Sequence, residues 1–173
     1  MALSPGHRRL LIVDQGVGAT VVNFLLNGGI AWLLFHSVAY VPLWGQSSIA
    51  GDTFATAFLL PLMTCLIVTR MVHHQVADGR VLPLPVVPTS GAVQFLASLS
   101  TFRRGMVLGL AGVVLGALPT ILWFAWEGPP ELPQGSFLWF KASFAAVLAA
   151  GVTPLIGWLA LVAPASEGQS ARS

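Results

Sequence analysis

Long apolar runs alternate with short polar breaks along the chain, and this pattern predicts four membrane-spanning helices. A spanning helix needs about 20 predominantly apolar residues. Runs that meet this requirement occupy residues 11–41, 49–72, 105–126 and 136–162. Proline and glycine close two of them, in YVPLWG after the first and in EGPPELPQG after the third. The predicted fold is therefore an all-α integral membrane protein, a four-transmembrane-helix bundle.

The longest connection, residues 71–104, lies between the second and third runs. Its stretch LPLPVVPTS is proline-rich, while GAVQFLASLSTF spaces apolar residues at helical intervals. This spacing predicts a short amphipathic helix in the interfacial region, and an early start of the third span is the alternative. No room remains for a separate soluble domain, so we expect residues 1–173 to form one membrane domain with a disordered tail over 163–173.

Basic residues divide the loops into two classes. They precede the first span, occupy the long connection and end the chain: Arg8, Arg9, Arg70, Arg80, Arg103, Arg104 and Arg172. The other two loops contain none. Because Lys and Arg of short loops stay in the cytoplasm, we expect both termini and the 71–104 connection to be cytoplasmic. The expected location is the plasma membrane, which is the inner membrane of a bacterium.

The composition excludes several classes of protein. Charged residues make up 8% of the chain, against about a quarter in soluble domains. The basic residues form no dense patch, so we expect no nucleic-acid partner. Cys65 is the single cysteine and cannot form an intramolecular disulfide or a redox pair. His36 is predicted at the opposite depth from His73 and His74, which argues against paired haem ligands. We expect neither a cofactor nor a metal.

Motifs of the common catalytic sites are missing from the sequence. It contains no glycine-rich nucleotide loop, no HExxH zinc motif, no GxSxG elbow and no paired carboxylates. The loops are also too short to build an active site from their own residues. We therefore predict no catalytic residue and no enzymatic activity.

Two asparagines lie four residues apart inside the first span, in NFLLNGGIAW. Asn23 and Asn27 share one helix face, and lipid offers their amides no hydrogen-bond partner. Pro61 in the second span has no N–H, so the carbonyl of Ala57 loses its helical donor. We predict that Asn27 donates to this carbonyl. We also predict that Asn23 reaches a deeper group such as Thr64, which makes the pair a seam between two spans. Alternatively, both asparagines line a path for a substrate or ion.

A carboxylate and a lysine are expected near the outer ends of spans two and four. Asp52 opens the second span, where a carboxylate caps the helix, and Thr53 and Thr56 continue its polar face. Lys141 is the only lysine and falls inside the fourth span, where it must snorkel or find a partner. Asp52 is the preferred partner, ahead of the two glutamates of the preceding loop. Capping by Asp52 beside a snorkelling Lys141 is the alternative.

Small residues form close-packing surfaces in two of the spans. They follow the second asparagine and recur along the third span: Gly28, Gly29, Gly105, Gly109, Gly112 and Gly116. Such positions let helices approach backbone to backbone. We expect this packing within one chain, and a homo-oligomer or another membrane protein as partner is the alternative.

The run NFLLNGGIAW, followed by VPLWG, SIAGDT and FLLPL, resembles small bacterial four-span membrane proteins that are sometimes labelled permeases. The resemblance covers spans one and two and implies transport without giving any residue a role. We predict a small transporter that acts through its intramembrane polar residues, Asn23, Asn27, Asp52, Thr53, Thr56 and Lys141. The alternative is an accessory protein of the bilayer that docks other membrane proteins. A cavity that reaches mid-depth would favour transport.

Overall fold

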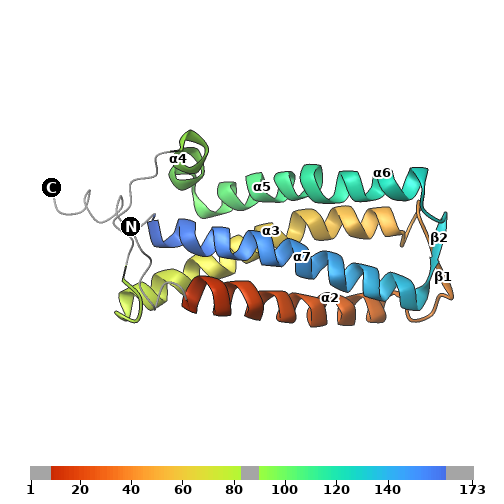
Figure 1. Ribbon diagram of the computed structural model, residues 1–173, viewed down its shortest axis with the longest axis horizontal. Coiled ribbons are helices and arrows are strands. Elements are labelled where there is room, and N and C mark those ends of the chain that lie inside the picture. Colours follow the sequence, from red (N-terminus) through yellow and green to blue (C-terminus); the bar gives the residue numbers. More distant parts are fainter. Residues whose placement is uncertain (1–8, 83–89, 163–173) are drawn as a thin grey trace.

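The computed structural model describes residues 9–82 and 90–162 (Figure 1). In chain order its elements are η1 (Arg9–Gly18), α2 (Ala19–Phe35), β1 (Tyr40–Pro42), α3 (Ile49–Ala77), α4 (Gly91–Ser98), α5 (Thr101–Gly112), η2 (Val113–Ala117), α6 (Leu118–Trp126), β2 (Glu131–Pro133) and α7 (Gln134–Val162). The segments η1 and η2 are π-helical. The segment η1 runs directly into α2, and η2 joins α5 to α6. The described residues therefore form four long continuous helices and the short helix α4.

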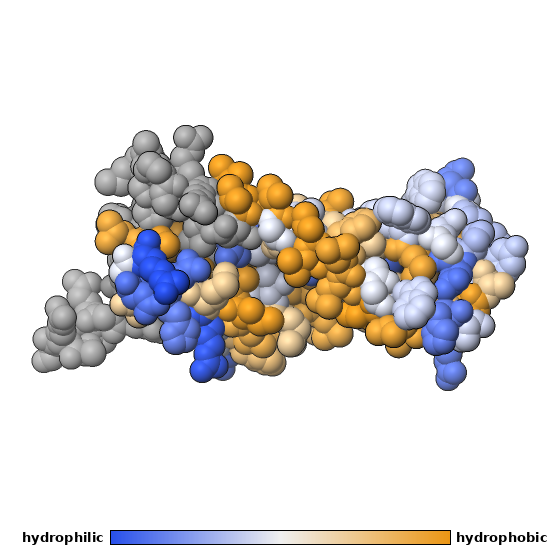
Figure 2. Space-filling model, turned by 90° about the horizontal axis from the view of Figure 1, so that it is seen from below, coloured by the Kyte–Doolittle hydropathy of each residue, from blue (hydrophilic) through white to orange (hydrophobic). Residues whose placement is uncertain are grey.

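Within residues 9–82 and 90–162, four helices are long and apolar enough to cross a membrane: Leu11–Phe35, Ile49–Ala77, Thr101–Trp126 and Gln134–Val162. Their axes lie side by side in one bundle (Figure 1). Figure 2 shows an apolar middle of the molecule and hydrophilic residues at both ends. A soluble protein cannot expose so large an apolar surface, whereas a bilayer covers it with hydrocarbon. The predicted all-α membrane bundle is confirmed.

The packing order of the helices differs from their order along the chain. The last helix, α7, lies at the centre and packs against α2, η1 and α3 (Figure 1). The helix α5 packs against the other side of α3. Although α2 and α3 are consecutive, α2 packs along α7 rather than along α3. This arrangement leaves α2 and α3 without extensive packing against each other.

A glycine surface on α5 explains its close contact with α3. A Cβ atom at Gly105 would lie 2.8 Å from a methyl of Leu62, and one at Gly109 would lie 2.7 Å from the carbonyl oxygen of Phe58. Real Cβ atoms do not approach a backbone atom as closely as at Gly109, so only glycine permits the packing there, whereas at Gly105 the leucine methyl could shift. Three of the four glycines predicted as a stripe therefore serve contacts within the chain, since Gly112 also lies against α3.

The connection between α3 and α5 contains the short helix α4. Arg104 of α5 is buried and donates hydrogen bonds to three carbonyls at the end of α4, those of Leu96 (2.8 Å), Ala97 (3.2 Å) and Leu99 (3.2 Å). The final carbonyls of a helix lack helical donors, and a guanidinium can supply several at once. The helix α4 is thus separate from α5 and not an early extension of it.

A two-stranded antiparallel ribbon joins the loops at the end opposite the start of η1 and the end of α7 (Figure 1). In it, Val41 of β1 lies opposite Leu132 of β2. The ribbon continues into the loops, where the N–H of Leu43 donates to the carbonyl of Pro130 at 2.8 Å. The sequence does not predict this ribbon, because each strand has only three residues. Strand β1 lies within the interval assigned to the first span, whose helix ends at Phe35.

Candidate functional site

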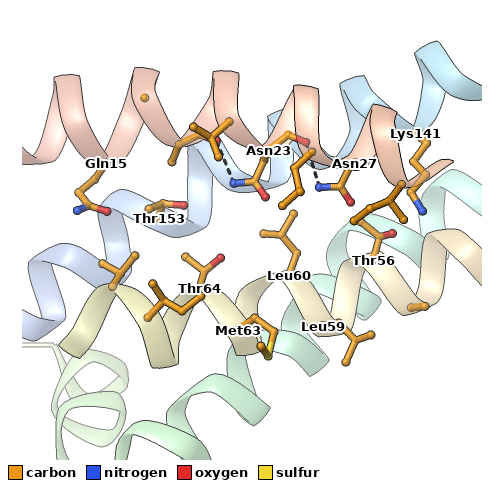
Figure 3. A pocket seen from close by; sticks show the side chains of 18 of the residues that line it. Gln15, Asn23, Asn27, Thr56, Leu59, Leu60, Met63, Thr64, Lys141 and Thr153 are labelled. Carbon is orange, nitrogen blue, oxygen red and sulfur yellow. Dashed lines mark hydrogen bonds between the residues drawn. The ribbon is translucent and has the colours of Figure 1, made fainter. Parts of the chain in front are cut away.

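An elongated groove of about 950 Å³ lies between α2 and α3 (Figure 3). Its lining follows α3 from Asp52 to Gln75, about 35 Å along the helix axis at 1.5 Å per residue. The hydrocarbon core of a bilayer is about 30 Å thick. The groove therefore matches the whole thickness of the hydrocarbon core and passes mid-depth.

The rims of the groove are apolar and face outward. Leu26 of α2 is 57% exposed, and on α3 Leu59 and Ile67 are 50% and 61% exposed. Because these side chains line the groove and also reach the outer surface of the bundle, the groove opens sideways. In a membrane this opening faces the lipid phase.

The two asparagines of α2 line the middle of the groove, but they do not form the predicted seam. The Asn23 Nδ2 group donates to the carbonyl of Ala19 at 2.9 Å, and the Asn27 Nδ2 group donates to the carbonyl of Asn23 at 3.0 Å. Both donors are therefore satisfied within α2. The predicted bonds from Asn27 to Ala57 and from Asn23 to Thr64 are wrong. The side chains face the space between the helices, with their amide oxygens toward the groove (Figure 3).

The carbonyl that Pro61 leaves without a helical donor points to another neighbour. A Cβ atom at Gly112 of α5 would overlap the carbonyl oxygen of Ala57. The glycine surface of α5 therefore covers this carbonyl, and α2 does not approach it. The prediction failed because it assumed that spans one and two, being consecutive, pack together.

Asp52 and Lys141 meet in an ion pair at one end of the groove. They lie near the starts of α3 and α7, the helices that follow β1 and β2. Their side chains are 12% and 5% exposed, so both charges are largely desolvated. Ser48 is the residue that caps α3, since its Oγ accepts a hydrogen bond from the N–H of Gly51 at 3.2 Å. The structure thus gives Asp52 a partner in α7, and Lys141 does not snorkel.

The two threonines that follow Asp52 differ in their surroundings. Thr56 lines the groove. Thr53 does not, because its hydroxyl donates to the carbonyl of Ile49 at 2.6 Å and its side chain is buried inside the bundle. Of the six polar residues predicted to act together, the structure brings five to the groove, and Thr53 is the exception.

The remaining predicted packing glycines lie in three different surroundings. A Cβ atom at Gly28 would lie 3.5 Å from the Cβ of Ala142, which is ordinary contact with α7. Gly29 has no atom within 4 Å of such a Cβ. Gly116 faces the ring of Phe144 at 3.7 Å. Of the two glycines in α2, only Gly28 therefore lies at a contact between helices.

Two buried polar residues of the groove were missed by the sequence analysis. Gln15 is 2% exposed and Thr153 is 1% exposed, and both line the groove. Within the described parts of the chain, Gln15 Nε2 and Thr153 Oγ1 have no hydrogen-bond partner. The sequence could have indicated Gln15, because it precedes Asn23 and Asn27 on the same continuous helix and adds a third amide to it. Thr153 gave no such signal.

Residues 9–82 and 90–162 contain no group of three His, Cys, Asp or Glu side chains that could hold a metal ion. The fold defines an integral membrane protein. Its groove is lined by polar and apolar side chains and opens toward the lipid. Neither a family model nor a solved structure matches the chain.

Two known proteins are similar to the chain. The sulfolipid-1 exporter Sap of Mycobacterium tuberculosis is 29% identical over 151 residues, which covers 81% of this chain and 56% of the exporter. The undecaprenyl-diphosphatase of Thermus thermophilus is 28% identical over 178 residues, which covers 91% of this chain and 66% of the diphosphatase. The chain thus spans less than two thirds of the length of either relative.

The second relative corrects one prediction. An undecaprenyl-diphosphatase is an enzyme, which contradicts the prediction that this chain has no enzymatic activity. The resemblance to proteins labelled permeases is supported to the extent that the first relative is named as an exporter.

Proposed function

We propose that the protein is a small transporter of an amphiphilic lipid, which occupies the groove between α2 and α3. The observation that carries this proposal is the length of the groove, about 35 Å from Asp52 to Gln75, together with its sideways opening. A lipid that enters through the apolar rims keeps its hydrocarbon chain in the lipid phase. Its polar headgroup can then move along the groove.

Polar side chains recur along the groove and favour an amphiphile over a plain hydrocarbon. Gln15, the two asparagines and the ion pair of Asp52 with Lys141 follow one another from one end to the other. A headgroup that crosses the hydrocarbon core loses its hydration, which is costly unless other hydrogen bonds replace it. These side chains provide such bonds at successive depths.

The two relatives support the same class of substrate. One is named as an exporter of sulfolipid-1, and the other is named for its action on undecaprenyl diphosphate. Each name describes a lipid that carries a polar headgroup. A groove that accepts a hydrocarbon chain beside polar side chains suits molecules of this kind.

The proposed location is the plasma membrane, with the start of η1 and the end of α7 in the cytoplasm. Arg70 and Arg104 lie on the parts of α3 and α5 nearest this end, while Glu131 lies in the ribbon at the other end (Figure 1). This distribution of basic residues agrees with the preference of Lys and Arg for cytoplasmic loops.

A lipid-scrambling assay tests the proposal. The purified protein is reconstituted into vesicles that contain phosphatidylethanolamine labelled on its headgroup with a dithionite-sensitive fluorophore. Transport makes the inner-leaflet label accessible to dithionite, so the protected fluorescence falls faster than in protein-free vesicles. Met63→Trp should slow this loss because the indole narrows the groove at its rim. Leu122→Trp is the matched control, since both parent residues are 52% exposed and Leu122 lies outside the groove.

The same vesicles, prepared with undecaprenyl diphosphate as a further component, distinguish transport from hydrolysis. If wild-type protein does not accelerate the loss of protected fluorescence, or if both tryptophan variants behave as wild type, the proposal is overturned. Inorganic phosphate released from undecaprenyl diphosphate, without movement of the labelled lipid, would assign hydrolysis to the chain in place of transport. Movement that only Met63→Trp slows would support the groove as the path.

A further inference from the structure

We infer that Gln15 and Thr153 form an uncharged subsite that holds the carbonyl oxygen of an acyl ester in the transported lipid. The inference rests on the proposed function and specifies the chemistry of its substrate. It starts from two buried side chains, 2% and 1% exposed, whose polar atoms have no partner among the described residues. Buried polar groups in proteins are almost always hydrogen-bonded, so two orphaned atoms in one groove indicate a ligand.

The two side chains come from different helices and share one end of the groove. Gln15 lies in η1 and packs against α7, where a Cβ atom at Gly157 would lie 3.3 Å from its Cγ. Thr153 lies one turn before Gly157 on the same helix. The side chains of Gln15 and Thr153 both lie beside the groove (Figure 3). The packing of Gln15 on the glycine brings its amide beside Thr153, with the amide oxygen toward Thr153 and the nitrogen pointing away (Figure 3). A rotation of the amide by 180° about its last bond turns the nitrogen toward the Thr153 hydroxyl, so that both donors can meet one acceptor. The π-helical turns of η1 are typical of functional positions in helices.

The unpartnered atoms can both donate a hydrogen bond. Gln15 Nε2 carries two N–H groups, and Thr153 Oγ1 carries one O–H. Among the described residues that line the groove, the charged ones are Asp52 and Lys141. Lys141 lies at the other end of the groove (Figure 3), and Asp52 is its ion-pair partner. An anion at Gln15 would therefore be buried without a counter-charge, which is far more costly than burial of a neutral acceptor. The subsite suits an uncharged carbonyl oxygen.

The subsite lies inside the hydrocarbon core, where the ester of a moving lipid finds no water. Thr153 lies nine residues before Val162, about 14 Å from the end of α7. The 29 residues of α7 extend about 44 Å, so each end projects about 7 Å beyond a hydrocarbon core of about 30 Å. Thr153 is then about 7 Å inside the core, a depth that an ester carbonyl reaches when the lipid moves inward along the groove. A polyprenyl diphosphate has no carbonyl to place there.

Ester-linked and ether-linked lipids provide a matched pair of probes. Native mass spectrometry of the purified full-length protein measures the Kd of diester phosphatidylglycerol and of its diether analogue, with the same headgroup and chain length. Wild-type protein should bind the diester about tenfold more tightly, which corresponds to two ordinary hydrogen bonds. Gln15→Met and Thr153→Val should each reduce this preference, and Thr153→Ser should retain it. Thr120→Val is the control, because the Thr120 hydroxyl bonds to the carbonyl of Gly116 and lies outside the groove.

The outcomes separate this inference from the proposed function. Equal binding of the two lipids by wild-type protein, as expected if water alone bridges Gln15 and Thr153, would overturn the ester subsite and leave lipid transport intact. An ester preference that survives both Gln15→Met and Thr153→Val would also overturn it. Absence of binding by either lipid, together with no scrambling, would reject the proposed function itself. Loss of the preference in only the two subsite variants would support the inference.

Discussion

Removal of one partner from the ion pair between Asp52 and Lys141 should destabilise the protein strongly. With side chains 12% and 5% exposed, the two charges are almost fully desolvated. Asp52→Asn leaves the lysine buried without its carboxylate, and Lys141→Met leaves the carboxylate without its cation. Breaking a buried pair in this way typically costs about 3–5 kcal/mol. The residual exposure of Asp52 favours the lower end, about 3 kcal/mol for each single variant.

The double variant Asp52→Asn/Lys141→Met should cost no more than either single variant. Once one charge is gone, removal of the other relieves an unpaired buried charge. We therefore expect a coupling free energy of about 3 kcal/mol, close to the loss in one single variant. Equilibrium unfolding in mixed micelles with increasing sodium dodecyl sulfate measures these free energies, and the six tryptophans report the transition by fluorescence.

A second carboxylate at the same end of the bundle provides the control. Glu127 is exposed, and Glu127→Gln combined with Lys141→Met should be additive within about 0.5 kcal/mol. If Asp52→Asn and Lys141→Met were additive to the same precision, the two side chains would act independently. The description of a desolvated pair would then be refuted, whatever the size of the single effects.

Two further predictions concern helix packing and topology. Gly112→Ala should destabilise the protein by about 1–3 kcal/mol, because the new methyl overlaps the Ala57 carbonyl. Gly29→Ala is the control, since its methyl has open space and should not destabilise the protein. The same unfolding assay compares the two variants, and equal effects would contradict the contact at Gly112. Glu127→Cys should react with an impermeant maleimide applied outside the cell, and Asp78→Cys should react only when the reagent is on the cytoplasmic side. Both positions are exposed, whereas Cys65 of the wild-type background is buried. The reverse pattern would overturn the orientation.

Local chemistry explains which parts of the fold the sequence predicted. Four apolar runs require four spanning helices because the backbone must satisfy its own hydrogen bonds in lipid. The buried Lys141 required a partner for a similar reason, and Asp52 was the carboxylate held on a helix near its depth. Such requirements belong to single residues or single helices. They can be recognised without knowledge of which helices are neighbours.

Neighbour relations were the part that the sequence could not predict. The amides of Asn23 and Asn27 were expected to cross to α3, but α2 packs against α7 and the amides bond within their own helix. An apolar helix surface does not distinguish one apolar partner from another, so the periodicity left the pairing open. The same uncertainty concealed the groove, because a groove is defined by helices that do not pack. Gln15 and Thr153 became a pair only through the contact of η1 with α7.

The central position of α7 has a consequence for biogenesis. A ribosome synthesises this helix after the other three spans, yet it is the helix against which α2 packs. The partners Asp52 and Lys141 are 89 residues apart in the chain, and β1 likewise waits for β2. The first two spans therefore enter the bilayer before their packing partner exists, and lipid must cover α2 in the interval. Final assembly is a late step, which begins only after the fourth span has left the insertion machinery.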